Sequence, residues 1–521
     1  MLAGTSFLAD EQASAPRRDE MNEAALKRIV IVGGGSAGWM AAATFARFLP
    51  PPACDIVLIE SDEIGIVGVG EGTVPLMTHF NGLLGIDERD FVAATNGSFK
   101  LGVEFRDWGE IGNIHFNGFG DYGDAIEGIA PHHHWLKLHR SGDPRPIDDW
   151  SMPYAAARRG RFAPAETLPA EDAFFKHAYH FDAGLYARFL RAHSEAQGVR
   201  RREGRITGVN LDPDTGFVAS VTMADGEQIG GDFFIDCSGF VGLLIDKALG
   251  VGFRDWSSLL PCDRAVAVGS EPVEHLTPFT RSTAKQAGWQ WRIPLQHRTG
   301  NGHVYCSEFI SDDEAAATLL DGLDAPALGE PRLLKFATGH RQRFWEKNVV
   351  AVGLAAGFME PLESTSIQLI QTALARVIEL MPDRGFDPVM IEEYNRVTQS
   401  EWERIRDFLI LHYCPTRRTE PFWRHCAQMT IPDTLAYKIA VFESCGRVAL
   451  FSEESYQEPS WVAIFLGNNM LPRRYDPLVD RLPLAHLRGG MNQRANAIAL
   501  AAERLPEQRA FIASCCSAKA A

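Results

Sequence analysis

The sequence has no excess of positive charge and no long hydrophobic run. Its 51 Lys and Arg residues face 67 Asp and Glu residues, a formal net charge of -16, and no long basic stripe could follow a phosphate backbone. We therefore expect no nucleic-acid partner. The longest weakly polar run, residues 349–359, is shorter than the about 20 apolar residues that cross a bilayer, so we expect a soluble protein with no membrane partner.

Cysteine pairs with regular spacing are also missing. The nine cysteines are an odd number and include no Cys-x-x-Cys pair, so neither a disulfide framework nor a zinc site is indicated. We expect no bound metal and a reducing, cytoplasmic location. In the N-terminal segment, Asp10, Glu11 and the charges at 17–20 interrupt the apolar core that a signal peptide needs. Residues 1–26 are expected to form a polar tail.

The composition is that of a globular enzyme. Hydrophobic residues make up 45% and charged residues 23% of the 521 positions, which excludes disordered, collagen-like and coiled-coil classes. Because a single hydrophobic core stops growing near about 250–300 residues, we expect two lobes.

A dinucleotide-binding unit is predicted near the start of the chain. The β-branched run 28–32 leads through a glycine turn into the alanine-rich stretch 39–48. The turn matches G-x-G-x-x-G, where a missing Cβ lets the backbone approach a pyrophosphate at a helix N-terminus. A second strand, 55–59, ends at an acidic residue about 20 positions after the last glycine, which suits a ribose hydroxyl. The alternative is a glycine-rich turn in an unrelated α/β unit. The expected cofactor-binding residues are Gly33, Gly35, Ser36, Ala37, Gly38 and Glu60.

Two later segments favour FAD over NAD. Residues 231–239 form a buried strand with a small-residue turn, and they resemble the strand that re-enters the Rossmann lobe in FAD-dependent oxygenases. The strand 348–352 is followed by Gly353, Leu354 and a helix that begins near Ser364, which resembles the flavin-holding segment of that superfamily. No second G-x-G-x-x-G stands in a strand context, so efficient reduction of the flavin by this chain itself is not expected.

Four further motifs occur in order along the chain. Residues 289–294 read W-x-W-x-I-P, with two indoles on one face of a strand. The others are Val69 to Pro75, Asn96 to Lys100 and Glu360 to Thr365. Together they resemble the flavin-dependent tryptophan halogenase family, over about residues 28–408. The resemblance implies an α/β fold in which a Rossmann-type FAD-binding lobe is interleaved with a second lobe, which contains a β-sheet and a largely helical C-terminal part.

The resemblance also implies a division of the chain and a reaction. After the tail we expect an FAD-binding halogenase core over 27–410, with Rossmann segments near 28–75, 200–245 and 345–385, and a helical region over 411–521 on the substrate side. In the family, FADH2 from a separate flavin reductase reacts with oxygen to a C4a-hydroperoxide. Halide, chloride or bromide, attacks its distal oxygen, and hypohalous acid passes through a tunnel to a small aromatic substrate such as indole. A homodimer is left open.

Site residues carry over from the family motifs. Trp289 and Trp291 correspond to guards that keep the substrate away from the flavin, with simple core packing as the alternative. Lys100 corresponds to the catalytic lysine, which acts either as an ammonium that hydrogen-bonds the hypohalous oxygen or as an amine that forms a haloamine. Either role needs a dry site, whereas most lysines are solvated surface charges.

Glu363 corresponds to the second catalytic residue. Its carboxylate can stabilise the cationic ring intermediate or accept its proton; the alternative is a first-turn charge favoured by the helix dipole. Thr365 and Ser366 fall where the family binds halide through backbone N–H groups at a helix start. Well-known members have Gly at the second position, so halide preference stays open.

The substrate side departs most from the family. His115, Phe116 and Phe119 lie in an aromatic run where the family places ring-sandwiching residues. Three adjacent histidines, 132–134, cannot all face one ion from a regular helix or strand. The segment 461–474 lacks the tyrosine-rich lid that grips the amino-acid group of tryptophan. It therefore indicates a substrate without that group, or a larger one bound otherwise.

Two other functions remain. A single-component FAD aromatic monooxygenase would need a nicotinamide-accessible flavin and would have no need for Lys100. A non-catalytic flavin-binding protein is the third alternative, and intact Lys100, Glu363 and tryptophan guards argue against it.

Overall fold

The described chain begins just before the first strand. The computed structural model describes residues 24–63, 70–169 and 173–517. Residues 1–23 of the expected tail and Val69 of the second motif lie outside these ranges. Leu26 is buried, and the Ala24 carbonyl accepts a hydrogen bond from the Arg384 amide (2.8 Å). The chain therefore joins the fold slightly earlier than the predicted boundary at residue 27.

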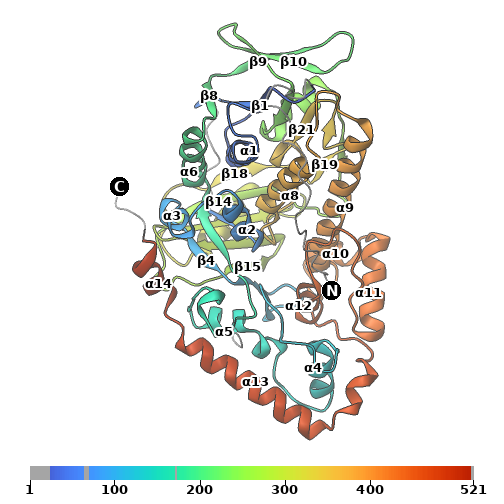
Figure 1. The fold of residues 1–521 in the computed structure, drawn as a ribbon. Helices are drawn as coiled ribbons and strands as arrows, with labels where there is room; N and C mark the ends of the chain where they lie inside the picture. The colour runs from blue at the N-terminus through green and yellow to red at the C-terminus, as the bar shows by residue number, and fades with distance from the viewer. Residues whose placement is uncertain (1–23, 64–69, 170–172, 518–521) are drawn as a thin grey trace, which may run out of the picture.

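A six-stranded sheet forms the Rossmann-type lobe at the upper end of Figure 1. Its order is β20-β21-β12-β1-β2-β8, parallel except for the β20–β21 pair. The strands are β20 (Trp345–Glu346), β21 (Val349–Ala351), β12 (Phe233–Asp236), β1 (Arg28–Val32), β2 (Asp55–Glu60) and β8 (Arg200–Glu203). Strands β1, β2 and β12 are continuous apolar runs because parallel strands are covered on both faces. Three distant segments thus build one sheet, as predicted, with α1 (Ser36–Phe48), α6 (Ala183–Ala196) and α8 (Thr365–Glu379) beside it.

A seven-stranded sheet forms the second lobe. Its order is β18-β14-β17-β16-β15-β5-β6, antiparallel except for the β15–β5 pair. The strands are β18 (Arg332–Lys335), β14 (Arg264–Ser270), β17 (Thr299–Tyr305), β16 (Gly288–Pro294), β15 (Thr280–Lys285), β5 (Gly102–Arg106) and β6 (Ile114–Gly118). The W-x-W-x-I-P motif forms β16, in the middle of this sheet. The mixed α/β class with interleaved lobes is therefore confirmed.

Three small three-stranded sheets complete the strand content of the described residues. They are β3 (Gly70–Gly72), β7 (Ala178–Asp182) and β4 (Ser98–Lys100); β11 (Gln228–Gly230), β10 (Val218–Met223) and β9 (Ile206–Leu211); and β13 (Phe253–Asp255), β19 (Gly339–Arg341) and β22 (Gly357–Phe358). In the first of these, β7 pairs with both β3 and β4. This pairing places the second and third family motifs on either side of β7.

Helices make up most of the remaining chain. The earlier ones are α2 (Leu76–Leu83), α3 (Glu88–Ala94), α4 (Pro131–Arg140), α5 (Met152–Arg158) and α7 (Asp312–Asp321). The C-terminal ones are α9 (Pro388–Tyr413), α10 (Pro421–Gln428), α11 (Asp433–Cys445), α12 (Glu458–Gly467), α13 (Leu484–Arg504) and α14 (Gln508–Cys515). Figure 1 shows α13 running along the lower end, beneath α4 and α5. A helical C-terminal part is thus present as expected.

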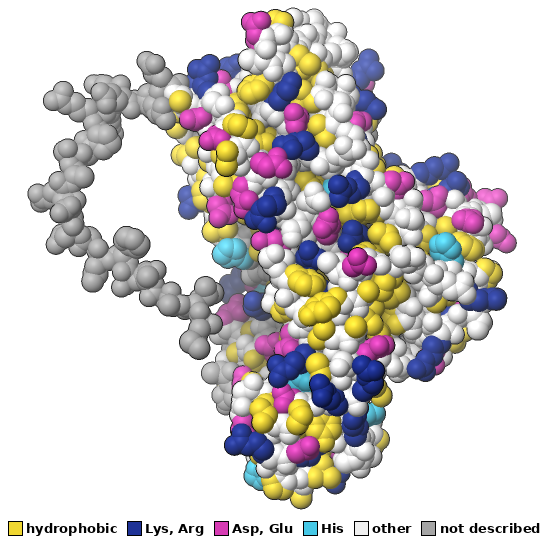
Figure 2. Space-filling view, turned by 90° about the vertical axis from the view of Figure 1, so that its right-hand side faces the viewer, with side chains coloured by type: hydrophobic (Ala, Val, Ile, Leu, Met, Phe, Trp, Pro, Cys, Tyr) yellow, Lys and Arg dark blue, Asp and Glu magenta, His cyan; other side chains and the backbone are white. Residues whose placement is uncertain are grey.

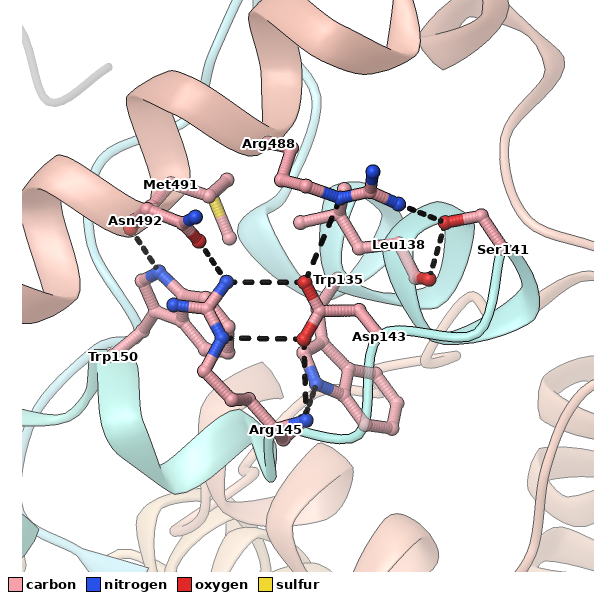
Figure 3. Close-up of polar contacts among 9 residues, drawn as sticks. All are labelled: Trp135, Leu138, Ser141, Asp143, Arg145, Trp150, Arg488, Met491 and Asn492. Atoms are coloured by element: carbon pink, nitrogen blue, oxygen red, sulfur yellow. Dashed lines mark hydrogen bonds and ion pairs between the residues drawn. The ribbon is translucent and has the colours of Figure 1, made fainter.

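Polar contacts fix α13 to the segment that follows α4 (Figure 3). Trp150 Nε1 donates to the Met491 carbonyl (2.8 Å), and the Arg145 guanidinium binds both Asp143 and the Asn492 side chain. Arg488 donates to Ser141 Oγ (3.1 Å). These contacts join residues 341–347 positions apart, so they fix a C-terminal helix to an early segment of the chain.

The surface carries both signs of charge. Figure 2 shows acidic and basic side chains over the face on which α9 and α11 lie, with hydrophobic side chains gathered between them. Within the described ranges, no helix has the length and apolar character needed to cross a membrane.

Candidate functional site

A cleft opens at the carboxyl ends of the Rossmann strands. Its volume is about 1170 Å³, and it extends from the glycine turn after β1 to Trp291 and the start of α8. This position, outside the strand ends of a parallel sheet, is where such folds bind ligands. Seven of the predicted cofactor residues line the cleft: Gly33, Gly35, Ser36, Ala37, Glu60, Gly353 and Leu354. The eighth, Gly38, lies just behind them, against Gly33.

The glycine turn has the shape that a pyrophosphate requires. A Cβ on Gly33 would lie 2.2 Å from the Cys237 carbonyl oxygen, and a Cβ on Gly38 would lie 1.8 Å from the Gly33 carbonyl oxygen. Only glycine permits this close packing of helix on strand. No described atom lies within 4 Å of the Cβ position of Gly35, so its missing side chain leaves the cleft open to a phosphate at the N-terminus of α1. Glu60 lines the same cleft and is held by Arg201 Nε and Trp39 Nε1. These residues fit an FAD.

Lys100 ends β4 and is fully buried. Its Nζ donates to the Thr73 carbonyl (2.9 Å) and to Ser364 Oγ (2.8 Å), and lies 5.2 Å from the centre of the Phe119 ring. Burial lowers the pKa of Lys100 from 10.5 to about 7, against the opposing effect of Glu363. Both the ammonium and the amine form of Lys100 are therefore accessible near neutral pH.

Glu363 lies in the same dry compartment, next to Ser364 in the chain. The side chain is 1% exposed, and its Oε1 accepts hydrogen bonds from Asn117 Nδ2 (2.9 Å) and faces His412 Nε2 (3.1 Å). Its Oε2 has no hydrogen-bond partner within the part of the chain that the structure describes. One oxygen is therefore fixed and the other is free to meet a proton or a cation.

The predicted halide residues lie at the start of α8. Ser364 precedes this helix in a left-handed conformation (φ 62°, ψ 39°), Thr365 is its first residue and is buried, and Ser366 lines the cleft. Helix N-terminal amides attract anions. The position between the cleft and Lys100 suits a halide that must react near the flavin.

The two tryptophans of β16 occupy different positions. Both lie on one face, with ring centres 6.1 Å apart, as a period of two predicts. Trp291 lines the cleft and lies against the backbone of Gly302, where a Cβ would come within 2.1 Å of its ring. Trp289 is buried behind it against Trp108. Trp291 faces the cofactor side, and Trp289 supports it.

Of the three predicted substrate residues, Phe116 points to the opposite face of β6 from His115. His115 and Asn117 occupy one face of β6, and His115 stacks on Phe105 (5.0 Å, 13°). Phe116 lies on the opposite face, against Tyr154 and Phe279. Strand alternation therefore makes Phe116 a core residue rather than a wall of the site, whereas Phe119 does reach Lys100.

The histidine run is part of α4, and each of its rings has a different hydrogen-bond partner. His132 Nε2 contacts the Gly446 carbonyl, His133 Nδ1 accepts from the Asp476 amide, and His134 Nδ1 contacts the Ala130 carbonyl. In the described residues no group of three His, Cys, Asp or Glu side chains could hold a metal ion.

The lid segment contributes packing rather than charge. Trp461 of α12 is buried against Phe408, and the Lys438 ammonium lies 4.5 Å from its ring and pairs with Glu454. Tyr456, just before the segment inspected in the sequence, stacks on Phe408 and donates to the Glu363 carbonyl (3.4 Å).

Sequence reasoning missed several residues of this site: Thr73, Asn117, Ser364, His412 and Tyr456. The available signal for His412 was a single polar residue in the apolar run Phe408 to Tyr413. Asn117 shares the strand face of His115, which a period-two reading of 114–118 would have shown.

Comparisons with known proteins agree with this geometry. A family model described as tryptophan halogenase matches residues 28–484. Tryptophan 6-halogenase SttH of Streptomyces toxytricini is 33% identical over 492 residues, which cover 88% of this chain and 92% of that protein. The solved structure of Xcc4156, a flavin-dependent halogenase from Xanthomonas campestris, has a TM-score of 0.92 at 45% identity and covers 95% of this chain and 100% of that one. The structure of BrvH, a flavin-dependent halogenase from Brevundimonas sp. BAL3, has a TM-score of 0.91 at 44% identity, and the match covers 94% of this chain and 99% of that one.

Proposed function

Because the chain belongs to the tryptophan halogenase family, we propose that it is an FADH2-dependent halogenase that installs chloride or bromide on an electron-rich aromatic ring such as indole. The observation that carries this proposal is the buried pair beyond the cleft. Lys100 Nζ donates a hydrogen bond to Ser364 Oγ, and Ser364 directly follows Glu363 in the chain. The side chains of Lys100 and Glu363 are both shielded from water. Reduced FAD, supplied by a separate flavin reductase, provides hypohalous acid from oxygen and halide when it is bound.

Lys100 is proposed to guide the hypohalous acid. Two acceptors, the Thr73 carbonyl and Ser364 Oγ, fix the direction of the amine. In the ammonium form a third N–H remains to bind the hypohalous oxygen, which makes the halogen more electrophilic. Since the pKa of Lys100 is about 7, this form is substantially populated at neutral pH. Trp291 stands at the cleft, where a bulky ring keeps the aromatic substrate away from the flavin.

Glu363 is proposed to act on the ring after halogen addition. Addition leaves a cationic intermediate that must lose a proton, and the free Oε2 can first stabilise the charge and then accept the proton. The fixed Oε1 keeps the carboxyl plane in place during this step.

The substrate is proposed to lack an amino-acid group. The charged and aromatic side chains near the lid have partners of their own: Lys438 with Glu454, and Tyr456 with Phe408. They leave little binding energy with which to orient the benzo ring of tryptophan. A loosely held indole reacts at its most nucleophilic carbon, C3. Bromide is expected to serve at least as well as chloride, because it is the easier ion to oxidise and to desolvate.

The test is product analysis with reduced flavin supplied in trans. Indole, L-tryptophan and phenol are each incubated with enzyme, a flavin reductase, NADH, FAD and either chloride or bromide, and products are identified by mass spectrometry. We expect a halogen isotope pattern on indole and a higher kcat/KM for indole than for L-tryptophan. An oxygenated product without halogen would identify a monooxygenase, and a single benzo-ring product with preference for tryptophan would refute the substrate assignment.

A further inference from the structure

His412 is placed to share a proton with Glu363. It lies in the buried last turn of α9, and its imidazole is fully buried. Its Nε2 lies 3.1 Å from Glu363 Oε1, and its Nδ1 lies 2.9 Å from the Phe408 carbonyl oxygen, one helical turn earlier.

The two contacts fix the number of protons in the pair. A carbonyl oxygen can only accept, so Nδ1 must carry a proton. Neutral imidazole then presents a lone pair at Nε2 to a carboxylate oxygen, and two acceptors at 3.1 Å need a proton between them. The pair therefore holds one shared proton, either as imidazolium with carboxylate or as imidazole with carboxylic acid.

The surroundings hold the imidazole in this orientation. Phe105 lies 4.9 Å from its centre, Phe408 lies edge-on at 5.1 Å, and Trp108 lies at 6.0 Å. These ring contacts and the two hydrogen-bond contacts together hold the imidazole in one orientation.

Few other ionisable groups face the pair. His115 packs on the other side of Phe105, and burial, with a contribution from His412, lowers its pKa to about 3, so it stays neutral. Burial keeps the pKa of Tyr456 well above its ordinary value. Among the described residues, Lys100 is a further charged group that interacts with Glu363.

We propose that His412 holds the compensating proton that keeps Glu363 Oε2 free as a proton acceptor at neutral pH. The inference rests on the proposed function and deepens it. In the deprotonation step, a C–H bond of the halogenated substrate ring breaks and its electron pair returns to that ring, while a Glu363 Oε2–H bond forms. The shared proton ends on Nε2. The pair goes from one proton to two, and the positive charge given up by the ring ends on the imidazolium. His412 does not touch the substrate, so it is a positioning residue that acts through Glu363.

Removal of the imidazole tests this assignment. In His412→Gln the amide can still donate to Oε1, but it cannot carry a charge. A buried carboxylate without a cationic partner takes up a proton from water. We expect kcat to fall at least about tenfold at pH 7, the size of a modest general-base effect, with little change in KM.

The dependence on pH separates this role from a structural one. The ratio of variant to wild-type kcat should rise with pH, because a more alkaline solution favours the free carboxylate, which the variant no longer stabilises with a cationic partner. A ratio that stays constant with pH would overturn the inference. His134→Gln is the matched control: His134 is buried and makes the same Nδ1 contact to the carbonyl four residues earlier, but it is far from Glu363. The control should keep wild-type kcat and pH profile.

A measurement without flavin checks the shared proton directly. Nitrogen-15 NMR of histidine-labelled protein identifies the His412 signals by their loss in His412→Gln. In Glu363→Gln, the Nε2 signal should move to the position of a nitrogen that accepts a hydrogen bond, and Nδ1 should stay protonated. An Nε2 signal identical in wild type and Glu363→Gln would overturn the inference. Failure of the wild type to halogenate any ring would instead overturn the proposed function, even with the NMR result as expected.

Discussion

Replacement of Lys100 by methionine should make the protein more stable while it removes the activity. The reason is that the lysine is fully buried, with its amine against the Thr73 carbonyl, Ser364 and the Phe119 ring, where its charged form is poorly solvated. In the unfolded chain the amine has its ordinary pKa, so folding must either bury a charge or release a proton. Methionine has a similar length and no charge, and it removes this cost.

The magnitude follows from the two pKa values, 10.5 unfolded and about 7 folded. Each tenfold change in proton affinity is worth about 1.4 kcal/mol, so the lysine costs about 4–5 kcal/mol of stability at pH 7 and below. The cost falls to about 2 kcal/mol at pH 9 and disappears above the unfolded pKa. Methionine leaves the Thr73 carbonyl and Ser364 Oγ without their donor, which offsets about 1–3 kcal/mol at every pH. The net gain is about 1–3 kcal/mol at pH 7, and it shrinks by about 2 kcal/mol at pH 9.

Urea unfolding followed by tryptophan fluorescence measures the gain. Wild type and Lys100→Met are compared at pH 7 and pH 9 at one ionic strength, and the difference between the two pH values isolates the titration from the lost hydrogen bonds. Lys247→Met is the control, because the Lys247 side chain is 64% exposed and its ammonium stays in water. A gain that does not shrink at pH 9 would show that Lys100 is not a desolvated amine with a lowered pKa.

Other variants address the remaining assignments. Lys100→Ala should keep FAD affinity and lose the halogenated product; retained turnover would remove the lysine from the mechanism. Gly35→Val fills the open approach to the turn and should abolish FAD binding in a fluorescence titration, while Gly82→Ala, on the surface helix α2, should leave it unchanged. Phe116→Leu should lower stability by about 1 kcal/mol with kcat/KM for indole unchanged, since the ring packs in the core. Phe119→Leu should lower kcat/KM, because its ring lies over the Lys100 amine.

Local chemistry made part of this protein predictable. The glycine turn, the strand before it and the helix after it depend on steric limits within about ten residues, and the structure reproduces them with Gly33 and Gly38 in close backbone contact. The period-two placement of Trp289 and Trp291 on one face is likewise a property of any strand. Three separated segments each have the pattern of a strand followed by a turn, and these patterns predicted that the Rossmann-type lobe is interleaved with the second lobe.

The individual roles within those patterns needed the tertiary structure. Which of the two tryptophans meets the cleft depends on the position of β16 in the sheet, and the sequence treats them alike. Phe116 points away from the face of β6 that holds His115 and Asn117 because residues adjacent in a strand point to opposite faces, and only the folded structure shows that Asn117 of that face contacts Glu363.

The Glu363–His412 pair shows most clearly what the sequence alone could not predict. Glu363 meets Asn117 from 246 positions earlier and His412 from 49 positions later. No local rule specifies such distances, because they arise when α9, β6 and the start of α8 pack around one core. The sequence by itself determined the cofactor turn, the fold class and the presence of a lysine and a glutamate in family motifs. Only the packing of distant elements decided that the lysine is dry, that one carboxylate oxygen is held and the other free, and that a histidine stands behind it, because burial and contact are properties of the folded chain.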